Sequence, residues 1–289
     1  MGALTGPLDG VVHLVAPEGM EAEEDGLVTA LVAALRRRWD RVAVWPVADA
    51  EADQVRCLAA LPEDEPVLLV PAQDAGAPLA SLVAGRVAVA AGRVLAESRL
   101  DTWVVENYRA GYLAGKHLVN LKHRDVAYLG PAGGSPAAAE RLRGFRQALA
   151  HNGRDLPAER VAEVEPDPAA VAEACRRWWS GGTEPTALFA ASPRLAAWAL
   201  DALEELGKAV PDGVALVAYG DGVLARALRP RLTAVVPPLE ELARQAAAGL
   251  AARAEEGRRA GQVRAEAVRL APRLVIRQSC GLAAGRRGA

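Results

Sequence analysis

The sequence predicts an α/β protein with two doubly wound parallel-sheet lobes. Short apolar segments alternate with segments of helical periodicity along nearly the whole chain. The apolar segments show little alternation of polar and apolar residues, which is typical of parallel strands covered on both faces. A single open sheet of roughly ten or more strands would be near the practical limit for a twisted sheet. The 289 residues are therefore expected to form two lobes.

The N-terminal part of the chain carries the first strand and helix signals. Residues 11–15 (VVHLV) form a short apolar run. Leu27, Leu31 and Leu35 recur at the spacing of one helix face. Arginines at 36–38 close this helix, where positive charge suits the carboxyl end. The expected strands are 11–15, 41–47, 67–70 and 86–90, and the expected helices are 27–38, 48–61 and 77–83.

The alternation begins again with a strand that ends at Glu106-Asn107. The same periodicities then predict helices at 108–121, 136–151, 168–180, 193–206 and 239–256, and strands at 125–129, 160–164, 186–190, 214–218, 232–235 and 274–276. The polar segment 253–264 is expected to be a loop, and 281–289 a loose tail.

Composition and spacing exclude several classes of protein. A net charge of −2 provides no global basic field for nucleic acid or an acidic membrane surface. No apolar run is long enough to span a bilayer, and the first residues lack a signal-peptide pattern. Cys57, Cys175 and Cys280 are far apart, which favours a reduced, cytoplasmic setting.

The sequence also lacks the usual catalytic and metal-binding patterns. The four histidines have no shared spacing of metal ligands, and no Gly-x-Ser-x-Gly elbow is present. The turn at residues 130–135 (GPAGGS) lies between a strand and a helix but has neither GxGxxG nor a P-loop lysine. We expect a protein without cofactor or metal that is not an enzyme.

A series of short motifs, in order and spacing, resembles one family. These are Glu106-Asn107, Gly111, His117-Leu118, Lys122-His123, residues 141–145 (RLRGF), 185–190 (PTALFA), 210–214 (VPDGV), 232–235 (LTAV) and 274–279 (LVIRQS). Together they are similar to the effector-binding core of the lactose/galactose repressor (LacI/GalR) family of transcriptional regulators. The resemblance covers nearly all of the chain.

This resemblance implies the type I periplasmic-binding-protein fold. One lobe would be 1–104 plus 235–262, and the other 105–234 plus 263–289. A small-molecule effector, such as a sugar, a sugar derivative or another polar or acidic metabolite, would bind in a cleft between the lobes and change their closure. The resemblance also implies a homodimer that represses or activates transcription through operator DNA.

The DNA-reading element of that family is not apparent in this sequence. About ten residues precede the first expected strand, too few for a helix-turn-helix. We therefore expect operator DNA to be bound only through a helix-turn-helix that is not in this chain. Two explanations are open: a regulator was trimmed to its effector-binding core, or the protein works without this element. Trimming is favoured because the other segments of the family pattern are present.

The resemblance also assigns candidate ligand-binding positions. Arg141 keeps the identity of the family's ligand-gripping arginine, whereas the other positions depart from the family pattern. The first loop offers Glu18 without an aromatic residue, Ser192-Pro193 replaces an Asn-Asp pair, and the turn Tyr219-Gly220-Asp221 lacks its first aspartate. The position at which relatives often carry a ligand-stacking aromatic falls near Val164, which is not aromatic. Ser135 and the amides of Gly133 and Gly134 are candidates for holding an anion beside Arg141.

These departures leave the ligand open. A sugar needs several donors and acceptors to replace lost water, so the loss of two polar groups argues against an ordinary pyranose. An acidic ligand, a less polar ligand and a vestigial pocket are comparable hypotheses. The leading function is the effector-sensing and dimerisation core of a LacI/GalR-type regulator. The alternatives are a stand-alone small-molecule-binding protein and a degenerate protein-interaction module, and an enzyme ranks below both.

Overall fold

The computed structural model describes residues 8–18, 26–96, 98–133, 135–180, 184–257, 260 and 265–281. The chain folds into two compact units, Met1–Val105 with Pro238–Leu270 and Glu106–Pro237 with Ala271–Ala289. Each unit contains one six-stranded sheet with helices on both faces. The expected α/β class with two doubly wound sheets is therefore confirmed. No helix in the described ranges is both long and apolar enough to cross a membrane.

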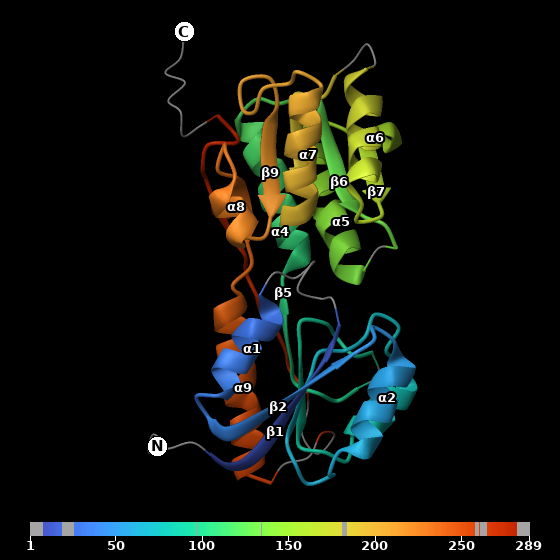
Figure 1. Ribbon diagram of the computed structural model, residues 1–289, viewed down its shortest axis with the longest axis vertical. Coiled ribbons are helices and arrows are strands. Elements are labelled where there is room, and N and C mark those ends of the chain that lie inside the picture. Colours follow the sequence, from blue (N-terminus) through green and yellow to red (C-terminus); the bar gives the residue numbers. More distant parts are fainter. Residues whose placement is uncertain are drawn as a thin grey trace. The chain divides into compact units, whose positions relative to one another are not determined.

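The first sheet is entirely parallel, with the strand order β11-β5-β4-β3-β1-β2. Its strands are β1 (Leu8–Pro17), β2 (Trp39–Val47), β3 (Val67–Leu69), β4 (Ala88–Ala91), β5 (Thr102–Val105) and β11 (Ala267–Leu270). Helices α1 (Leu27–Leu35) and α9 (Leu239–Glu255) pack side by side on one face, and α2 (Glu51–Ala60) and α3 (Ala77–Val83) cover the other (Figure 1).

Burial on both faces explains the continuous apolar strands of this unit. Leu14 and Leu68 lie in the core under α1 and α9, whereas Val15 and Leu69 lie in the core under α2 and α3. All four side chains are fully buried. Successive residues of a strand point to opposite faces of the sheet. When helices cover both faces, neither set of side chains meets solvent, and most positions are apolar.

The second sheet has the order β12-β10-β9-β8-β6-β7 and is parallel except for β12, which runs antiparallel to β10. Its strands are β6 (Val126–Pro131), β7 (Val161–Val164), β8 (Ala187–Ala190), β9 (Ala215–Tyr219), β10 (Thr233–Val236) and β12 (Arg273–Val275). Helices α4 (Asn107–Asn120) and α5 (Pro136–Ala150) cover one face. Helices α6 (Pro168–Trp179), α7 (Pro193–Glu205) and α8 (Val223–Ala227) cover the other, and a 3-10 turn spans Ala158–Arg160 (Figure 1).

The expected elements are present, with bounds that move by a few residues. The elements that were not expected are the edge strand β11, the short helix α8 and the 3-10 turn Ala158–Arg160. Their few residues carry little periodic signal, and β11 is mostly exposed. The expected loop at 253–264 begins later, because α9 continues to Glu255. Residues 258–259, 261–264 and 282–289 lie outside the described part of the chain.

Helices α4 and α5 approach each other more closely than side chains would allow. A Cβ atom added to Gly111 would overlap the carbonyl oxygen of Arg141, and one added to Gly144 would overlap the carbonyl oxygen of Tyr108. Gly115 is also close, with its added Cβ 2.8 Å from Ala148 Cβ. The glycines therefore permit backbone-to-backbone packing, and the spacing of the two helices is fixed by main-chain atoms.

Replacement of Gly144 by alanine should destabilise the second unit. The new methyl group meets backbone rather than a movable side chain, so the free energy of unfolding should fall by about 2 kcal/mol or more. Urea unfolding measures this change. Gly85→Ala is the matched control, because nothing lies within 4 Å of its added Cβ, and its stability should change by about 0.5 kcal/mol or less. Equal stability of the two variants would contradict the close crossing.

Candidate functional site

The carboxyl ends of β6, β8 and β9 form the candidate site of the second unit. These strands are neighbours in a parallel arrangement, so their carboxyl ends lie at one edge of the sheet. β6 leads to Ser135 at the start of α5, β8 leads to Ser192 at the start of α7, and β9 ends at Tyr219. Ligands of open α/β sheets bind at this kind of edge.

Arg141 is the buried charge at this edge. Only 5% of the residue is exposed. Its Nη1 donates a hydrogen bond of 2.8 Å to Asn107 Oδ1, and its Cζ lies 4.3 Å from the centre of the Tyr219 ring. Its Nε is buried and has no hydrogen-bond partner among the described residues. The structure thus brings together two of the candidate site residues, Arg141 and Tyr219.

The glycine-mediated helix crossing positions this arginine. Asn107 opens α4 and Gly111 follows one turn later, where it meets the backbone of Arg141. The amide that binds the guanidinium and the glycine that contacts the main chain therefore lie on one face of α4. Asn107 was expected as part of a family motif and not as a site residue.

The charge on Arg141 also reaches the buried Tyr128 of β6. Burial raises the pKa of Tyr128 to about 12, although the positive charge on Arg141 acts to lower it. Tyr128 is 1% exposed, and its hydroxyl donates a weak hydrogen bond of 3.4 Å to the Ala138 carbonyl oxygen. The tyrosine therefore stays neutral and supplies no compensating negative charge to the arginine.

Ser135 and Ser192 cap the two helices that start at the site. Each hydroxyl oxygen accepts a hydrogen bond of 3.2 Å, from the Ala138 amide in α5 and from the Leu195 amide in α7. Capping satisfies amide groups at a helix start that have no partner within the helix. Because the oxygen accepts, each hydroxyl keeps its own hydrogen for donation.

Asp221 is engaged in ion pairs. Its Oδ1 lies 2.5 Å from Arg277 Nη2, its Oδ2 lies 2.9 Å from Arg226 Nη2, and its side chain is 5% exposed. Arg277 also donates to the Leu232 carbonyl oxygen at 2.7 Å, which joins the segment after β12 to the start of β10. The carboxylate therefore ties chain segments together rather than presenting a free acceptor.

Gly220 and Pro193 are in mutual contact. Gly220 has φ +95, a conformation that favours glycine, and its added Cβ would lie 2.7 Å from Pro193 Cγ. These residues stand at two positions where the family pattern has aspartates. The proline ring fills the space that a side chain at residue 220 would need, so the two departures from the pattern fit each other.

The remaining candidate ligand-binding residues of the described ranges, Val164 and Glu18, form no hydrogen bond or ion pair with Arg141. Val164 is half-buried in β7, and its carbonyl oxygen accepts a hydrogen bond of 2.7 Å from the Ala132 amide. Glu18 is exposed in the first unit, where its amide donates to the Val47 carbonyl oxygen at 2.6 Å. Gly134 lies outside the described residues.

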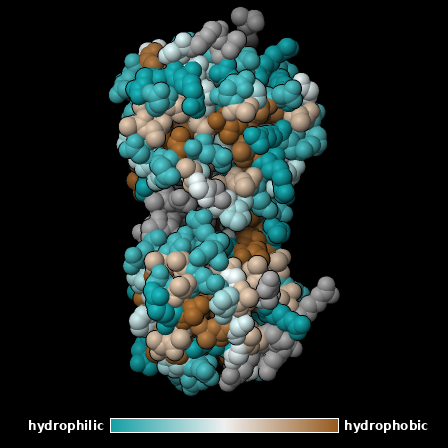
Figure 2. Space-filling view, turned by 90° about the vertical axis from the view of Figure 1, so that its right-hand side faces the viewer, coloured by the Kyte–Doolittle hydropathy of each residue, from teal (hydrophilic) through white to brown (hydrophobic). Residues whose placement is uncertain are grey.

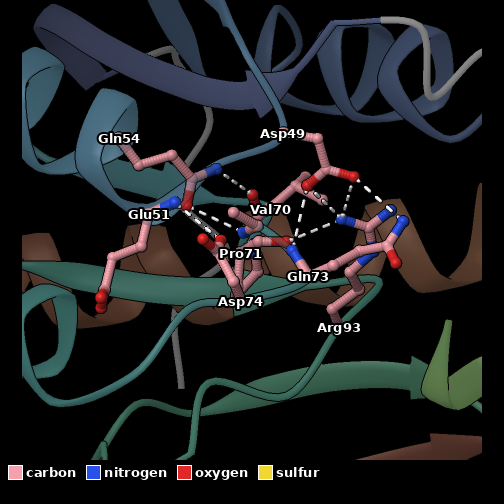
Figure 3. Close-up of polar contacts among 9 residues, drawn as sticks. Asp49, Glu51, Gln54, Val70, Pro71, Gln73, Asp74 and Arg93 are labelled. Carbon is pink, nitrogen blue, oxygen red and sulfur yellow. Dashed lines mark hydrogen bonds and ion pairs between the residues drawn. The ribbon is translucent and has the colours of Figure 1, made fainter. Parts of the chain in front are cut away.

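A polar cluster occupies the loops after β2, β3 and β4 of the first unit (Figure 3). Asp49 accepts hydrogen bonds from the backbone N–H of Gln73 at 3.0 Å and from Arg93 Nη1 at 2.8 Å. Glu51 Oε1 accepts from the Gly76 and Leu79 amides and so caps the start of α3. The carboxylates are bonded within the cluster, which indicates a scaffold for these loops. Sequence periodicity carries no signal for it.

The described residues contain no group of three or more His, Cys, Asp or Glu side chains able to hold a metal ion. The two doubly wound sheets define an α/β protein of the periplasmic-binding-protein type. A family model for the periplasmic binding protein-like domain matches residues 116–280.

Individual relatives agree with this class. The regulator DegA of Bacillus subtilis (strain 168) is 30% identical over 182 residues, which are 62% of this chain and 52% of DegA. A solved structure of a LacI-family transcriptional regulator from Sanguibacter keddieii DSM 10542 is 30% identical, with a TM-score of 0.79 and coverage of 94% of this chain and 99% of that one. The regulator CelR in complex with cellobiose is 25% identical, with a TM-score of 0.77 and coverage of 93% and 84%.

The chain belongs to the periplasmic binding protein-like family and, within it, to the LacI-type transcriptional regulators. It spans about half the length of the curated relatives it matches. The chain therefore corresponds to an effector-binding regulatory core.

Replacement of Asp221 by asparagine should lower stability. The substitution removes two ion pairs and leaves the largely buried Arg277 without its carboxylate, at a cost of roughly 1–3 kcal/mol. Thermal unfolding measures the loss. Glu173→Gln is the control, since its pair with Arg176 is exposed on both sides and should contribute little. An unchanged melting temperature for Asp221→Asn would show that Asp221 is not a structural tie.

Proposed function

We propose that this chain senses a small-molecule effector and forms the dimerisation core of a LacI/GalR-type transcriptional regulator. The observation that carries the proposal is the buried Arg141, held by Asn107 and Tyr219 at the carboxyl edge of the second sheet. A charge is buried at such an edge at a cost in free energy, which a ligand-binding role explains. The cellobiose complex of the relative CelR supports a small-molecule effector.

In this proposal the effector acts by differential binding. It binds one conformational state of the core more tightly than another, and the favoured state has a different affinity for operator DNA. DNA is bound by a helix-turn-helix unit that is not among the elements described. The core itself performs no chemistry, in keeping with relatives named as regulators. A cytoplasmic location follows from access to the operator.

The dimer part of the proposal is supported by the free edge of the first sheet. β2 is the edge strand, and Val44 and Trp45 on it are each 40% exposed. Figure 2 shows that hydrophobic residues form patches on an otherwise mostly hydrophilic face of the molecule. Exposed apolar residues on an edge strand are suited to contact a second copy of the chain through a two-fold interface.

The effector is testable by thermal shift. A screen of sugars, sugar phosphates, purines and organic acids should yield a compound that raises the melting temperature, because binding stabilises the folded state. Arg141→Ala should abolish that rise. A full rise in the variant would show that Arg141 is not the anchor. Consumption of any compound during the screen would instead favour an enzyme.

The dimer is testable by sedimentation equilibrium. We expect a mass of twice 30.2 kDa for the chain. Val44→Glu should shift the mass towards the monomer, because a two-fold interface brings the new charge in from both copies. Val223→Glu makes the same change at a valine that is 81% exposed in the second unit and should leave the dimer intact. A Val44→Glu protein that remains dimeric would exclude this edge as the interface.

A further inference from the structure

We propose that the effector carries an anionic group, a carboxylate or a phosphate, that pairs with Arg141. This inference rests on the proposed effector-binding function and adds the chemical class of the ligand. Two features of the second unit carry it, namely the charge balance around the arginine and the donors and acceptors at the same sheet edge.

Four other arginines of the described residues, of which Arg86 and Arg253 are buried and the other two largely buried, meet carboxylates or several carbonyl oxygens. The pairs are Arg93 with Asp49, Arg253 with Asp101 and Arg277 with Asp221. Arg86 donates to the carbonyl oxygens of Leu58, Leu61 and Pro62. These carbonyls lie at the carboxyl end of α2, which carries partial negative charge. Each of these guanidinium groups is therefore electrically compensated.

Arg141 has no such compensation. Its partners are a neutral amide, Asn107, and an aromatic ring, Tyr219. Within the described ranges no carboxylate lies within 4.0 Å of its guanidinium, and its Nε is buried without a partner. A buried guanidinium stays charged and is costly unless paired. An anion at the site would supply the missing partner and would accept charge-assisted hydrogen bonds.

The two neighbouring serines can donate hydrogen bonds, and few side-chain carboxylates are free at this edge. Ser135 and Ser192 keep hydroxyl hydrogens, and the amino ends of α5 and α7 favour negative charge. The Asp221 carboxylate is already paired with two arginines. Pro193 and Gly220 bring no side-chain acceptor where the family pattern has aspartates. A neutral sugar needs acceptors for its hydroxyl hydrogens, whereas an anion needs only donors.

The experiment compares matched compounds that differ in charge. The pairs are D-glucose with D-gluconate, D-ribose with D-ribose 5-phosphate, and inosine with inosine monophosphate, with inorganic phosphate as a further probe. We expect an anionic member to raise the melting temperature and to bind more tightly by calorimetry than its neutral partner. Equal or tighter binding of the neutral members would overturn the anionic class and leave the effector function standing. Failure of every probe to bind would count against both.

Variants of the full chain assign the effect to Arg141. Arg141→Gln should weaken binding of the anionic hit by at least about tenfold, the loss of a charge-assisted pair. Arg143→Gln is the matched control, because Arg143 is exposed on the same helix and lies over the Tyr108 ring at 5.1 Å. It should keep the affinity. Equal affinity of Arg141→Gln and the unmodified chain would overturn the proposal.

A second variant keeps the proposal testable if the Arg141→Gln protein does not fold. Pro193→Asp adds a carboxylate at the start of α7, where an acidic residue suits the helix. It should weaken the anionic hit by about three- to tenfold through repulsion at short range and leave the neutral partner unaffected. Unchanged affinity for the anion would show that the ligand's charge lies elsewhere.

Discussion

The close crossing of α4 and α5 is the constraint on which the rest of the second unit depends. Gly111 and Gly144 allow the main chains to touch, so the spacing of the two helices is fixed by backbone atoms. Asn107 lies one turn before Gly111 and binds the guanidinium of Arg141. A rigid crossing therefore places a buried charge at the sheet edge with little freedom to move, which is the preorganisation that a binding site needs.

Several departures from the family pattern lie at the same sheet edge as Arg141. Pro193 occupies the space that Gly220 leaves, and Asp221 is drawn into ion pairs with Arg226 and Arg277. The result is an edge with an uncompensated cation, hydroxyl donors and few acceptors. Arg141, which we propose binds the ligand, is thus left without a balancing carboxylate, because the candidate acceptors are replaced or already paired.

The alternation of apolar and helical segments was enough to predict the fold, because strands covered on both faces, such as residues 67–69, have an unmistakable composition. The edge strand β11 was missed because only one of its four residues is buried. The family motifs gave Arg141 and Tyr219 as separate candidate ligand-binding residues, and the contact between them emerged only from the structure. Sequence could not predict the Pro193–Gly220 contact or the pairing of Asp221, because both depend on side chains from separate strand ends. The polar cluster around Asp49 and Arg93 had no sequence signal for the same reason.

Arg141, in this view, is held in place and lacks only an anionic partner. Nuclear magnetic resonance of the arginine Nε–Hε groups tests this directly, with the Arg141 signal assigned by its loss in Arg141→Lys. We expect one sharp Arg141 signal, slow to exchange with solvent, that shifts when the stabilising anion from the matched pairs is added and stays unchanged with its neutral partner. A signal that is unaffected by an anion that stabilises the protein would contradict the pairing of that anion with Arg141.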